Sequence, residues 1–284
     1  MHRLKVTHLT EYRFTEWVTL EPHRLLLRPR EGHDMRIVSS RLDISPRHEI
    51  KWHRDVYDNS VAVVSFLEAA SYLSILSEIM LEHYEEAPLD FVVADYAVDY
   101  PFQYQPYEQP DLTPYQQPSY PWDAAAVRDW LRRLGLVQGG LQTYVMLDRL
   151  SKAIAGTFLY TMREAPGVQS PSQTLYSGSG SCRDYATLFI EACRQLGLAC
   201  RFVSGYLHAP STEAGHASTH AWAETYLPGA GWKGFDPTAG ELTAARHIPV
   251  AVARHPESIP PVAGSFVGSA QTPELRVDVR VTSL

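Results

Sequence analysis

A proline-rich stretch over residues 100–122 limits how this chain can fold, because no helix interior or central strand can run through it. Its sequence, YPFQYQPYEQPDLTPYQQPSYPW, contains six prolines, and each lacks the backbone N–H that a helix or a sheet ladder needs. We therefore predict an extended connector over residues 101–122, between a first domain over 1–100 and a second over 123–284. The length of 284 residues fits this division, since domains usually hold roughly 100 to 200 residues.

The composition excludes several classes of protein. With 45% hydrophobic and 20% charged residues, the chain can bury a core, which argues against a disordered or fibrous protein. A net charge of −7 without any basic block disfavours nucleic acid or an anionic membrane as the main partner. The N-terminus has no apolar signal-like region, and no stretch has the roughly 18 to 20 apolar residues of a membrane helix. We therefore expect a cytoplasmic protein.

The first domain is predicted to be a small β-sandwich. Short β-rich runs punctuated by turn residues span 5–14, 18–27, 35–44 and 61–66. Asp58-Asn59 predicts a hairpin before the last of these runs. Residues 71–80 are compatible with either a strand or a short helix.

Helices open the second domain, and a strand ends it. Asp123 precedes an amphipathic run that Gly135 closes, which predicts a helix over 123–135. A second helix is predicted over 141–155. Residues 274–281 alternate between apolar and charged side chains, which predicts a half-buried strand that we assign to this domain. The fold class is therefore α+β.

Cys182 lies where a flexible loop runs into a helix. The Gly and Ser loop at 177–181 precedes a run whose apolar residues recur at helical spacing until Gly197 ends it. Ser181 and Asp184 match a capping box, which predicts Ser181 as the N-cap and Cys182 as the first helical residue. The free N–H groups and the positive dipole end of such a helix favour a thiolate, so Cys182 is predicted to be a nucleophile.

The other two cysteines are predicted to fill the core. Cys193 lies three turns further along the same helix, about 16 Å from Cys182, so these two thiols cannot pair. Three cysteines without a C-x-x-C pair also argue against a disulfide framework or a cysteine zinc site. Cys193 and Cys200 therefore behave as small buried hydrophobic residues.

An antiparallel hairpin is predicted after this helix. Residues 220–227 alternate with His220 on one face, residues 228–231 form a turn, and residues 232–236 return as a second strand that ends in Asp236. The hairpin can therefore bring a histidine and a carboxylate to the same sheet.

The register of the hairpin is open between two alternatives. If the turn closes on residues 227–229, His220 lies directly opposite Asp236 on the same face, about 5 Å away at Cβ. A four-residue turn over 228–231 would instead place Asp236 opposite Ala223, roughly 10 Å out of register, and would require a bulge.

A Cys/His/Asp set is chemically complete for acyl transfer. His220 would hold or take the proton of Cys182, and Asp236 would fix the tautomer of the imidazole. The oxyanion would bind the backbone N–H of Cys182 and one further donor. Three side chains are candidates for that donor: Gln173, Tyr176 and Trp222. The sequence calls for no cofactor and no metal.

A metal site is the rival interpretation of the same histidine. His216 and His220 have i, i+4 spacing and could bind a metal together with Asp236. The residues around His216 do not suggest a helix, and no glutamate follows it to complete an H-E-x-x-H motif. We therefore prefer the acyl-transfer interpretation.

Four linked motifs carry a family resemblance. They are Gly180-Ser181-Cys182-Arg183-Asp184-Tyr185-Ala186, Arg201-Phe202-Val203-Ser204-Gly205-Tyr206, His220-Ala221-Trp222-Ala223-Glu224, and Gly231-Trp232 followed by Phe235-Asp236-Pro237-Thr238. Their order and spacing resemble the core of the bacterial transglutaminase-like superfamily. The first 100 residues, notably 23–30 and Asp58-Asn59, are similar to the β-rich N-terminal region that often precedes this core.

The resemblance implies a papain-like core in which Cys182 heads a helix packed on an antiparallel sheet that bears His220 and Asp236. We expect cysteine-dependent acyl transfer on amide or peptide bonds, by a protease, an amidase or a transamidase. The partner would be a peptide or protein substrate, with water or a primary amine as acceptor. The alternative is a non-catalytic binding or assembly module, because relatives of this kind include members without catalysis.

Overall fold

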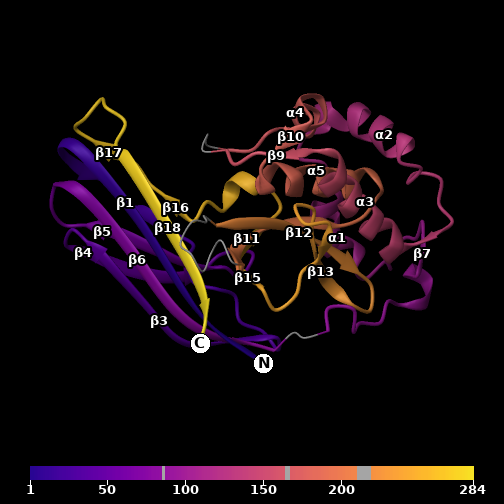
Figure 1. Cartoon of the computed structure of the whole chain (residues 1–284), viewed down its shortest axis with the longest axis horizontal. Coiled ribbons are helices and arrows are strands. Elements are labelled where there is room, and N and C mark those ends of the chain that lie inside the picture. Colours follow the sequence, from indigo (N-terminus) through magenta and orange to yellow (C-terminus); the bar gives the residue numbers. More distant parts are fainter. Residues whose placement is uncertain (85–86, 164–166, 210–218) are drawn as a thin grey trace.

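The computed structural model consists of a β-sandwich and an α+β body that lie side by side (Figure 1). It describes residues 1–84, 87–163, 167–209 and 219–284. Among these residues, no helix is long and apolar enough to cross a membrane. The predicted fold class is confirmed, since a β-sandwich is joined to helices packed on an antiparallel sheet.

Two antiparallel sheets form the sandwich. The first has the order β17-β1-β6-β3, with β18 also on β1, and comprises β1 (His2–Leu20), β3 (Met35–Ser45), β6 (Ala70–His83), β17 (Phe266–Val267) and β18 (Glu274–Ser283). The second has the order β16-β2-β5-β4 and comprises β2 (His23–Leu25), β4 (His48–Arg54), β5 (Ser60–Phe66) and β16 (Val262–Ala263). Alternating apolar side chains of both sheets, such as Leu73, Ile75 and Val64, are buried between them.

The hairpin predicted at Asp58-Asn59 is present. Strands β4 and β5 pair antiparallel up to Arg54 and Ser60, and Asp58 has a φ of 61°, a conformation that Asp and Asn adopt more readily than most residues. Residues 71–80 lie within strand β6 and do not form a helix.

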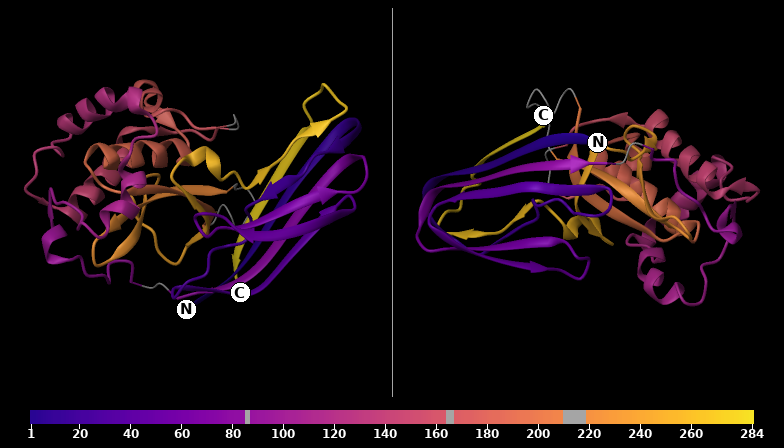
Figure 2. Two further views of the ribbon diagram at one scale, coloured as in Figure 1. Left: turned by 180° about the vertical axis from the view of Figure 1, so that it is seen from behind. Right: turned by 90° about the horizontal axis from the view of Figure 1, so that it is seen from below.

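The C-terminal strand joins the sandwich. Residues 274–283 of β18 pair antiparallel with residues 4–13 of β1, and Figure 2 shows the last strand alongside the first. The assignment of this strand to the second domain is therefore wrong. Alternation correctly indicated a half-buried strand, with Val279 and Val281 buried, but a strand's partner at the other end of the chain is not encoded in its local pattern.

The proline-rich segment is packed against the body, so the extended form predicted for it is wrong in part. It contains helix α1 (Gln109–Gln116), whose Pro110 lies in the first turn, where a helix tolerates proline. Pro114 lies inside the same helix, so the prediction that no helix interior runs through this stretch is wrong. Leu112 and Tyr104 are buried beside Ala199, and the Tyr104 hydroxyl accepts the Ala199 N–H at 2.9 Å. The segment folds because the body covers its apolar side chains.

The body combines helices with a five-stranded sheet. Its longer helices are α2 (Ala124–Arg133), α3 (Thr143–Thr157), α4 (Pro171–Ser177) and α5 (Cys182–Gln195). The sheet has the order β14-β13-β12-β11-β15 and comprises β11 (Cys200–Leu207), β12 (His220–Leu227), β13 (Gly231–Asp236), β14 (Glu241–Leu242) and β15 (His247–Ala253). Short elements connect these parts: η1 (Asp95–Ala97), β7 (Asp99–Tyr100), η2 (Pro121–Asp123), β8 (Leu141–Gln142), β9 (Leu159–Tyr160), β10 (Ser179–Gly180) and η3 (Pro256–Ser258).

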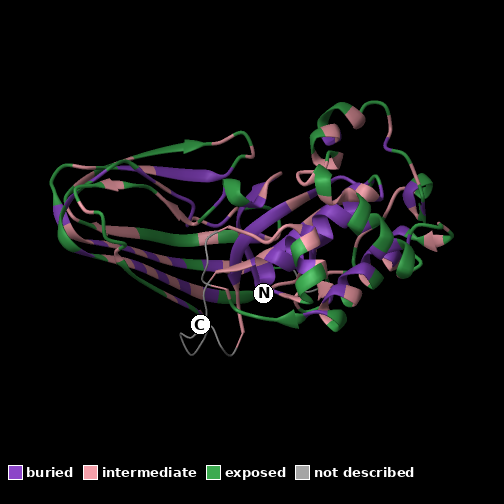
Figure 3. Ribbon diagram, turned by 90° about the horizontal axis from the view of Figure 1, so that it is seen from above, coloured by how far each residue is buried: buried purple, intermediate pink, exposed green. Residues whose placement is uncertain are grey.

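Helix α5 is the central helix of the body, and Figure 3 shows it as largely buried. Its Phe189 stacks on Phe235 of β13 with ring centroids 5.5 Å apart. The helices predicted over 123–135 and 141–155 are present as α2 and α3. A buried helix on a sheet gives the N-terminus of α5 a fixed position relative to β12 and β13.

Buried polar side chains join the sandwich to the body. The Asn59 amide donates to the Val252 carbonyl at 2.8 Å and accepts the Val252 N–H at 2.9 Å. His8 Nδ1 lies 3.0 Å from the Tyr206 hydroxyl. The sandwich therefore holds strands β15 and β11 of the body.

Candidate active site

Cys182 is the first residue of α5, with Ser181 as the N-cap, as the sequence predicts. The thiol is buried, with a relative exposure of 7% for the residue. Gly180 lets the chain approach the helix closely, since a Cβ at this position would lie 2.9 Å from the Cβ of Asp184. The sequence thus places the sulfur beside the free N–H groups of a helix start.

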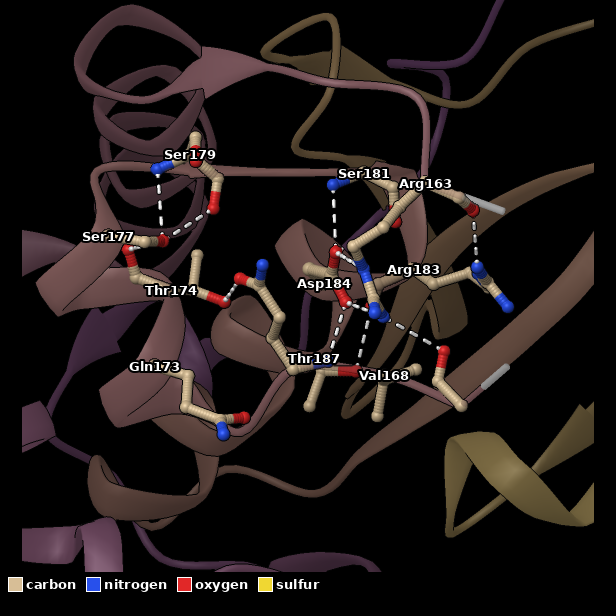
Figure 4. A network of polar contacts seen from close by, with 12 residues as sticks. Arg163, Val168, Gln173, Thr174, Ser177, Ser179, Ser181, Arg183, Asp184 and Thr187 are labelled. Carbon is tan, nitrogen blue, oxygen red and sulfur yellow. Dashed lines mark hydrogen bonds and ion pairs between the residues drawn. The ribbon is translucent and has the colours of Figure 1, made fainter. Parts of the chain in front are cut away.

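A buried carboxylate fixes this helix start (Figure 4). Asp184 Oδ2 accepts both the N–H and the hydroxyl of Ser181 at 2.8 Å. The same carboxylate accepts the guanidinium of Arg163 at 3.2 Å and the N–H of Gln169 at 2.7 Å. Burial by itself raises the pKa of the Asp184 carboxyl, but these donors outweigh burial and lower it. Asp184 therefore ties Arg163 and Gln169 to the first turn of α5.

The hairpin that bears the other two residues has neither of the registers considered from the sequence. Leu227 pairs with Gly231, and Ala223 pairs with Phe235. A three-residue turn, closed by a bond from the Ala230 N–H to the Leu227 carbonyl at 2.9 Å, sets this register. If the pairing continued, position 236 would lie opposite position 222, two residues from His220.

An offset of two residues keeps both side chains on the same face of the sheet. Diagonal neighbours on one face are within reach of long side chains. His220 Nε2 accordingly lies 2.7 Å from Asp236 Oδ2, with exposures of 11% and 1% for the two side chains. The predicted His/Asp pair is formed diagonally across the hairpin.

The structure brings Cys182 to the same imidazole. His220 Nε2 faces Asp236, and Cys182 lies near enough to the same ring to help raise its pKa. Burial by itself lowers the pKa of His220, but the bonds to Asp236 and Cys182 outweigh it and raise this pKa to about 10. Burial likewise raises the pKa of Asp236, and its two histidine partners more than offset that, so the carboxyl stays ionised.

His247 is a fourth member of the site that the sequence analysis missed. This buried residue at the start of β15 lies with Nε2 3.1 Å from Asp236 Oδ2. The chain has twelve histidines, and no local motif distinguishes His247 from the others. His247 and Asp236 lie on strands that β11 and β12 separate in the sheet, so strand order alone does not predict their contact.

The described residues contain one cluster with metal-ligand chemistry, formed by donor atoms of His220, Asp236 and His247 within 4.8 Å of one another. The alternative ligand His216 lies outside the described residues. His247 Nδ1 accepts the N–H of Ala244 at 3.2 Å, so the proton of this ring is on Nε2, the atom that faces the carboxylate. A metal bound at Nε2 would displace that proton. The contacts therefore favour a hydrogen-bonded array.

Tyr160 is another residue that sequence reasoning missed. It pairs with Gly180 between the short parallel strands β9 and β10, two residues before Cys182. Its hydroxyl lies near the Cys182 thiol, which helps to raise the pKa of Tyr160. Burial and the neighbouring Cys182 and Asp236 raise the pKa of Tyr160 to about 12, so the hydroxyl stays protonated and can donate.

Of the three oxyanion candidates named from the sequence, Gln173 and Tyr176 belong to α4, and Trp222 is packed beside His220 and His247. Gln173 Oε1 accepts the N–H of Ser170 at 2.8 Å and so caps α4, while Tyr176 is 97% exposed. Both line a shallow pocket of about 440 Å³ with Arg163 and Gln169. Trp222 is buried, with its ring 5.3 Å from that of His247. Tyr160, whose hydroxyl lies near the Cys182 thiol, is a further candidate for this donor.

The two remaining cysteines lie in the core. Cys193 and Cys200 are fully buried free thiols, and both contact the Thr225 hydroxyl, at 3.8 and 3.4 Å. Burial raises the pKa of the Cys193 thiol well above its usual value. Cys193 is thus an unreactive thiol, in keeping with its predicted role as core filler.

Two family models match the parts of the chain described above. Residues 132–237, which include Cys182, His220 and Asp236, match the transglutaminase-like superfamily. Residues 4–82 match the bacterial transglutaminase-like N-terminal region. The chain therefore contains a transglutaminase-like core preceded by the bacterial transglutaminase-like N-terminal region. The family resemblance of the four sequence motifs is thereby confirmed.

Relatives of this transglutaminase-like protein occur in mycobacteria. The uncharacterized protein Rv2569c of Mycobacterium tuberculosis is 28% identical over 307 residues, which cover 99% of this chain and 92% of the relative. The uncharacterized protein ML0607 of Mycobacterium leprae is 34% identical over 124 residues, which cover 42% of this chain and 43% of the relative.

A solved structure shares the fold over the whole chain. It is that of a candidate cysteine protease from Cytophaga hutchinsonii, with a TM-score of 0.75 and 18% identity. The superposition covers 100% of this chain and 91% of the other. The arrangement of a β-sandwich beside a transglutaminase-like body is therefore shared with that protein.

Proposed function

We propose that this transglutaminase-like protein is a cysteine-dependent acyl-transfer enzyme that acts on amide or peptide bonds. One observation carries the proposal: His220 Nε2 lies 2.7 Å from Asp236 Oδ2, and Cys182 lies close enough to the same imidazole to help raise its pKa. Catalysis through a thioester requires a nucleophile next to a base, and a carboxylate that orients the base.

The reaction would proceed in two halves. The Cys182 thiolate attacks the carbonyl carbon, a C–S bond forms, and the carbonyl oxygen takes up the negative charge. The His220 imidazolium then gives its proton to the leaving amine, the C–N bond breaks, and a thioester remains. Water or a primary amine attacks this thioester while His220 takes the proton of the acceptor, which releases the thiolate of Cys182.

Two donors are placed to bind the oxyanion. The backbone N–H of Cys182 lies at the start of α5, where N–H groups have no partner within the helix. The Tyr160 hydroxyl, whose pKa the neighbouring Cys182 helps to raise, is the second candidate donor. Removing one such donor commonly lowers kcat by about 10²- to 10³-fold.

The substrate would be a peptide or protein. This part of the proposal draws on the fold shared with a candidate cysteine protease, and the choice between water and an amine as acceptor belongs to the experiment. The cytoplasmic location expected from the sequence is also part of the proposal. Fractionation of cells with an antibody against the native protein would test it.

Alkylation by iodoacetamide tests the nucleophile. At neutral pH, mass spectrometry should find Cys182 labelled at least tenfold faster than Cys193 or Cys200, because a thiolate is the reactive form. Peptide libraries incubated with and without a primary amine would then separate hydrolysis from amine transfer. Equal labelling of the three cysteines, or full activity in Cys182→Ala, would contradict the proposal and favour a binding module.

A further inference from the structure

We propose that His247 is a positioning residue that holds the Asp236 carboxylate in the orientation His220 needs. The inference rests on the proposed acyl-transfer function, and it assigns a role to a residue outside the Cys182, His220 and Asp236 set. It is carried by the hydrogen bonds at the two nitrogens of the His247 ring.

The His247 ring carries its proton on Nε2. Its Nδ1 accepts the N–H of Ala244 at 3.2 Å, and a nitrogen that accepts a hydrogen bond carries no proton in the neutral ring. Burial lowers the pKa of His247, although the bond to Asp236 opposes this, so the ring is neutral. The remaining proton is then on Nε2, and His247 is a fixed donor to Asp236 Oδ2 at 3.1 Å.

The Asp236 carboxylate accepts hydrogen bonds at both of its oxygens. Asp236 Oδ2 accepts from both His220 and His247, while Oδ1 accepts the N–H of Thr238 at 2.9 Å. Rotation of the carboxylate away from His220 would therefore break bonds at both oxygens. Because His247 and Thr238 hold the carboxylate from the protein side, the direction in which it faces His220 is set before any substrate binds.

Strand pairing and a ring contact fix the position of His247. Its strand β15 pairs with β11, where His247 lies opposite Leu207, and the Trp222 ring contacts the imidazole edge to face. The sandwich forms hydrogen bonds with the same strand. The Arg30 N–H donates to the Pro249 carbonyl at 2.8 Å, and the Asn59 side chain is hydrogen-bonded to the backbone of Val252. The N-terminal sandwich thus stabilises the position of β15, the strand that bears His247.

A donor-keeping and a donor-less variant test the proposal. In His247→Gln the amide nitrogen can still donate to Asp236, whereas His247→Leu fills similar space without a donor. For the Leu variant we expect kcat to fall about 10- to 100-fold, the cost typical of losing an outer partner of a functional histidine, while KM stays within about twofold. The Gln variant should retain kcat to within about fivefold, on the same reasoning.

The rate of Cys182 alkylation gives a second readout that needs no substrate. It should fall in His247→Leu and be retained in His247→Gln, so this arm decides the role of His247 even if no peptide is turned over by the wild-type protein. If His247→Leu fails to fold by circular dichroism, His247→Met serves as the donor-less variant. Wild-type kcat and alkylation in the donor-less variant, or an equal loss in both variants, would overturn the proposal.

Discussion

His220 and Asp236 meet diagonally across the β12–β13 hairpin, with Nε2 and Oδ2 2.7 Å apart. Trp222, two residues after His220 on β12, is buried, and its ring centroid lies 6.1 Å from that of His220. The diagonal arrangement leaves the second nitrogen of His220 free to face Cys182 on the neighbouring helix. The pair is therefore matched to a nucleophile that comes from another element.

The pKa of His220 predicts a pH dependence. An imidazolium is needed to protonate the leaving amine, and burial disfavours it, but Asp236 and Cys182 raise the pKa of His220 to about 10. Activity should therefore be lost as the pH rises through about 10. Asp236→Asn removes the negative charge that stabilises the imidazolium, so the pKa of His220 should fall and the alkaline limb should move to lower pH. We expect kcat to fall about 10³- to 10⁴-fold.

A pH–rate profile of the wild type and the variant measures this shift. Asp129→Asn is the control, because Asp129 is an exposed partner of Arg132 on α2 and should leave the profile unchanged. An unchanged alkaline limb in Asp236→Asn would show that this carboxylate does not set the pKa of His220.

Tyr160→Phe removes the hydroxyl that lies near the Cys182 thiol. If this hydroxyl binds the oxyanion, kcat should fall about 10²-fold with little change in KM, since the bond forms fully only in the transition state. Tyr176→Phe is the matched control, because Tyr176 is 97% exposed. Equal kinetics in the two variants would remove Tyr160 from the site.

Asp184→Ala should destabilise the protein strongly. The Asp184 side chain is fully buried and its partner Arg163 is 24% exposed, so the change leaves a largely buried cation and several N–H groups without their acceptor. Breaking a buried pair in this way costs about 3 to 5 kcal/mol in the free energy of unfolding. Urea denaturation measures the loss, and Asp129→Ala, in an exposed pair, should stay within about 0.5 kcal/mol of the wild type.

His8 predicts a loss of stability in acid. Burial beside Tyr206 lowers the pKa of folded His8 from 6.5 to about 4. Between these values the unfolded chain binds more protons than the folded one, so the stabilisation is complete above pH 6.5 and is lost as the pH falls toward 4. At pH 4.5 the loss from His8 should reach about 2 to 3 kcal/mol.

Comparison with His8→Gln isolates this contribution from that of the other titrating groups. The free energy of unfolding should fall less between pH 7 and pH 4.5 in the variant than in the wild type. An equal decrease of the free energy of unfolding in both proteins would show that protonation of His8 does not cause the loss of stability in acid.

Local sequence patterns predicted the elements that bear the site. A glycine loop, a capping box and a helical period placed Cys182 at the first position of α5, because caps and periodicity depend on residues within about four positions of one another. Alternation around a turn likewise identified the β12–β13 hairpin. The family motifs gave the same set of Cys182, His220 and Asp236.

How these elements meet depends on contacts between distant parts of the chain. The hairpin register followed from a three-residue turn, and β18 found its partner at the opposite end of the chain. His247 and Tyr160 entered the site through strand pairing with β11 and β10. Such pairings depend on which distant surfaces bury one another, and a local pattern of residues does not contain that information.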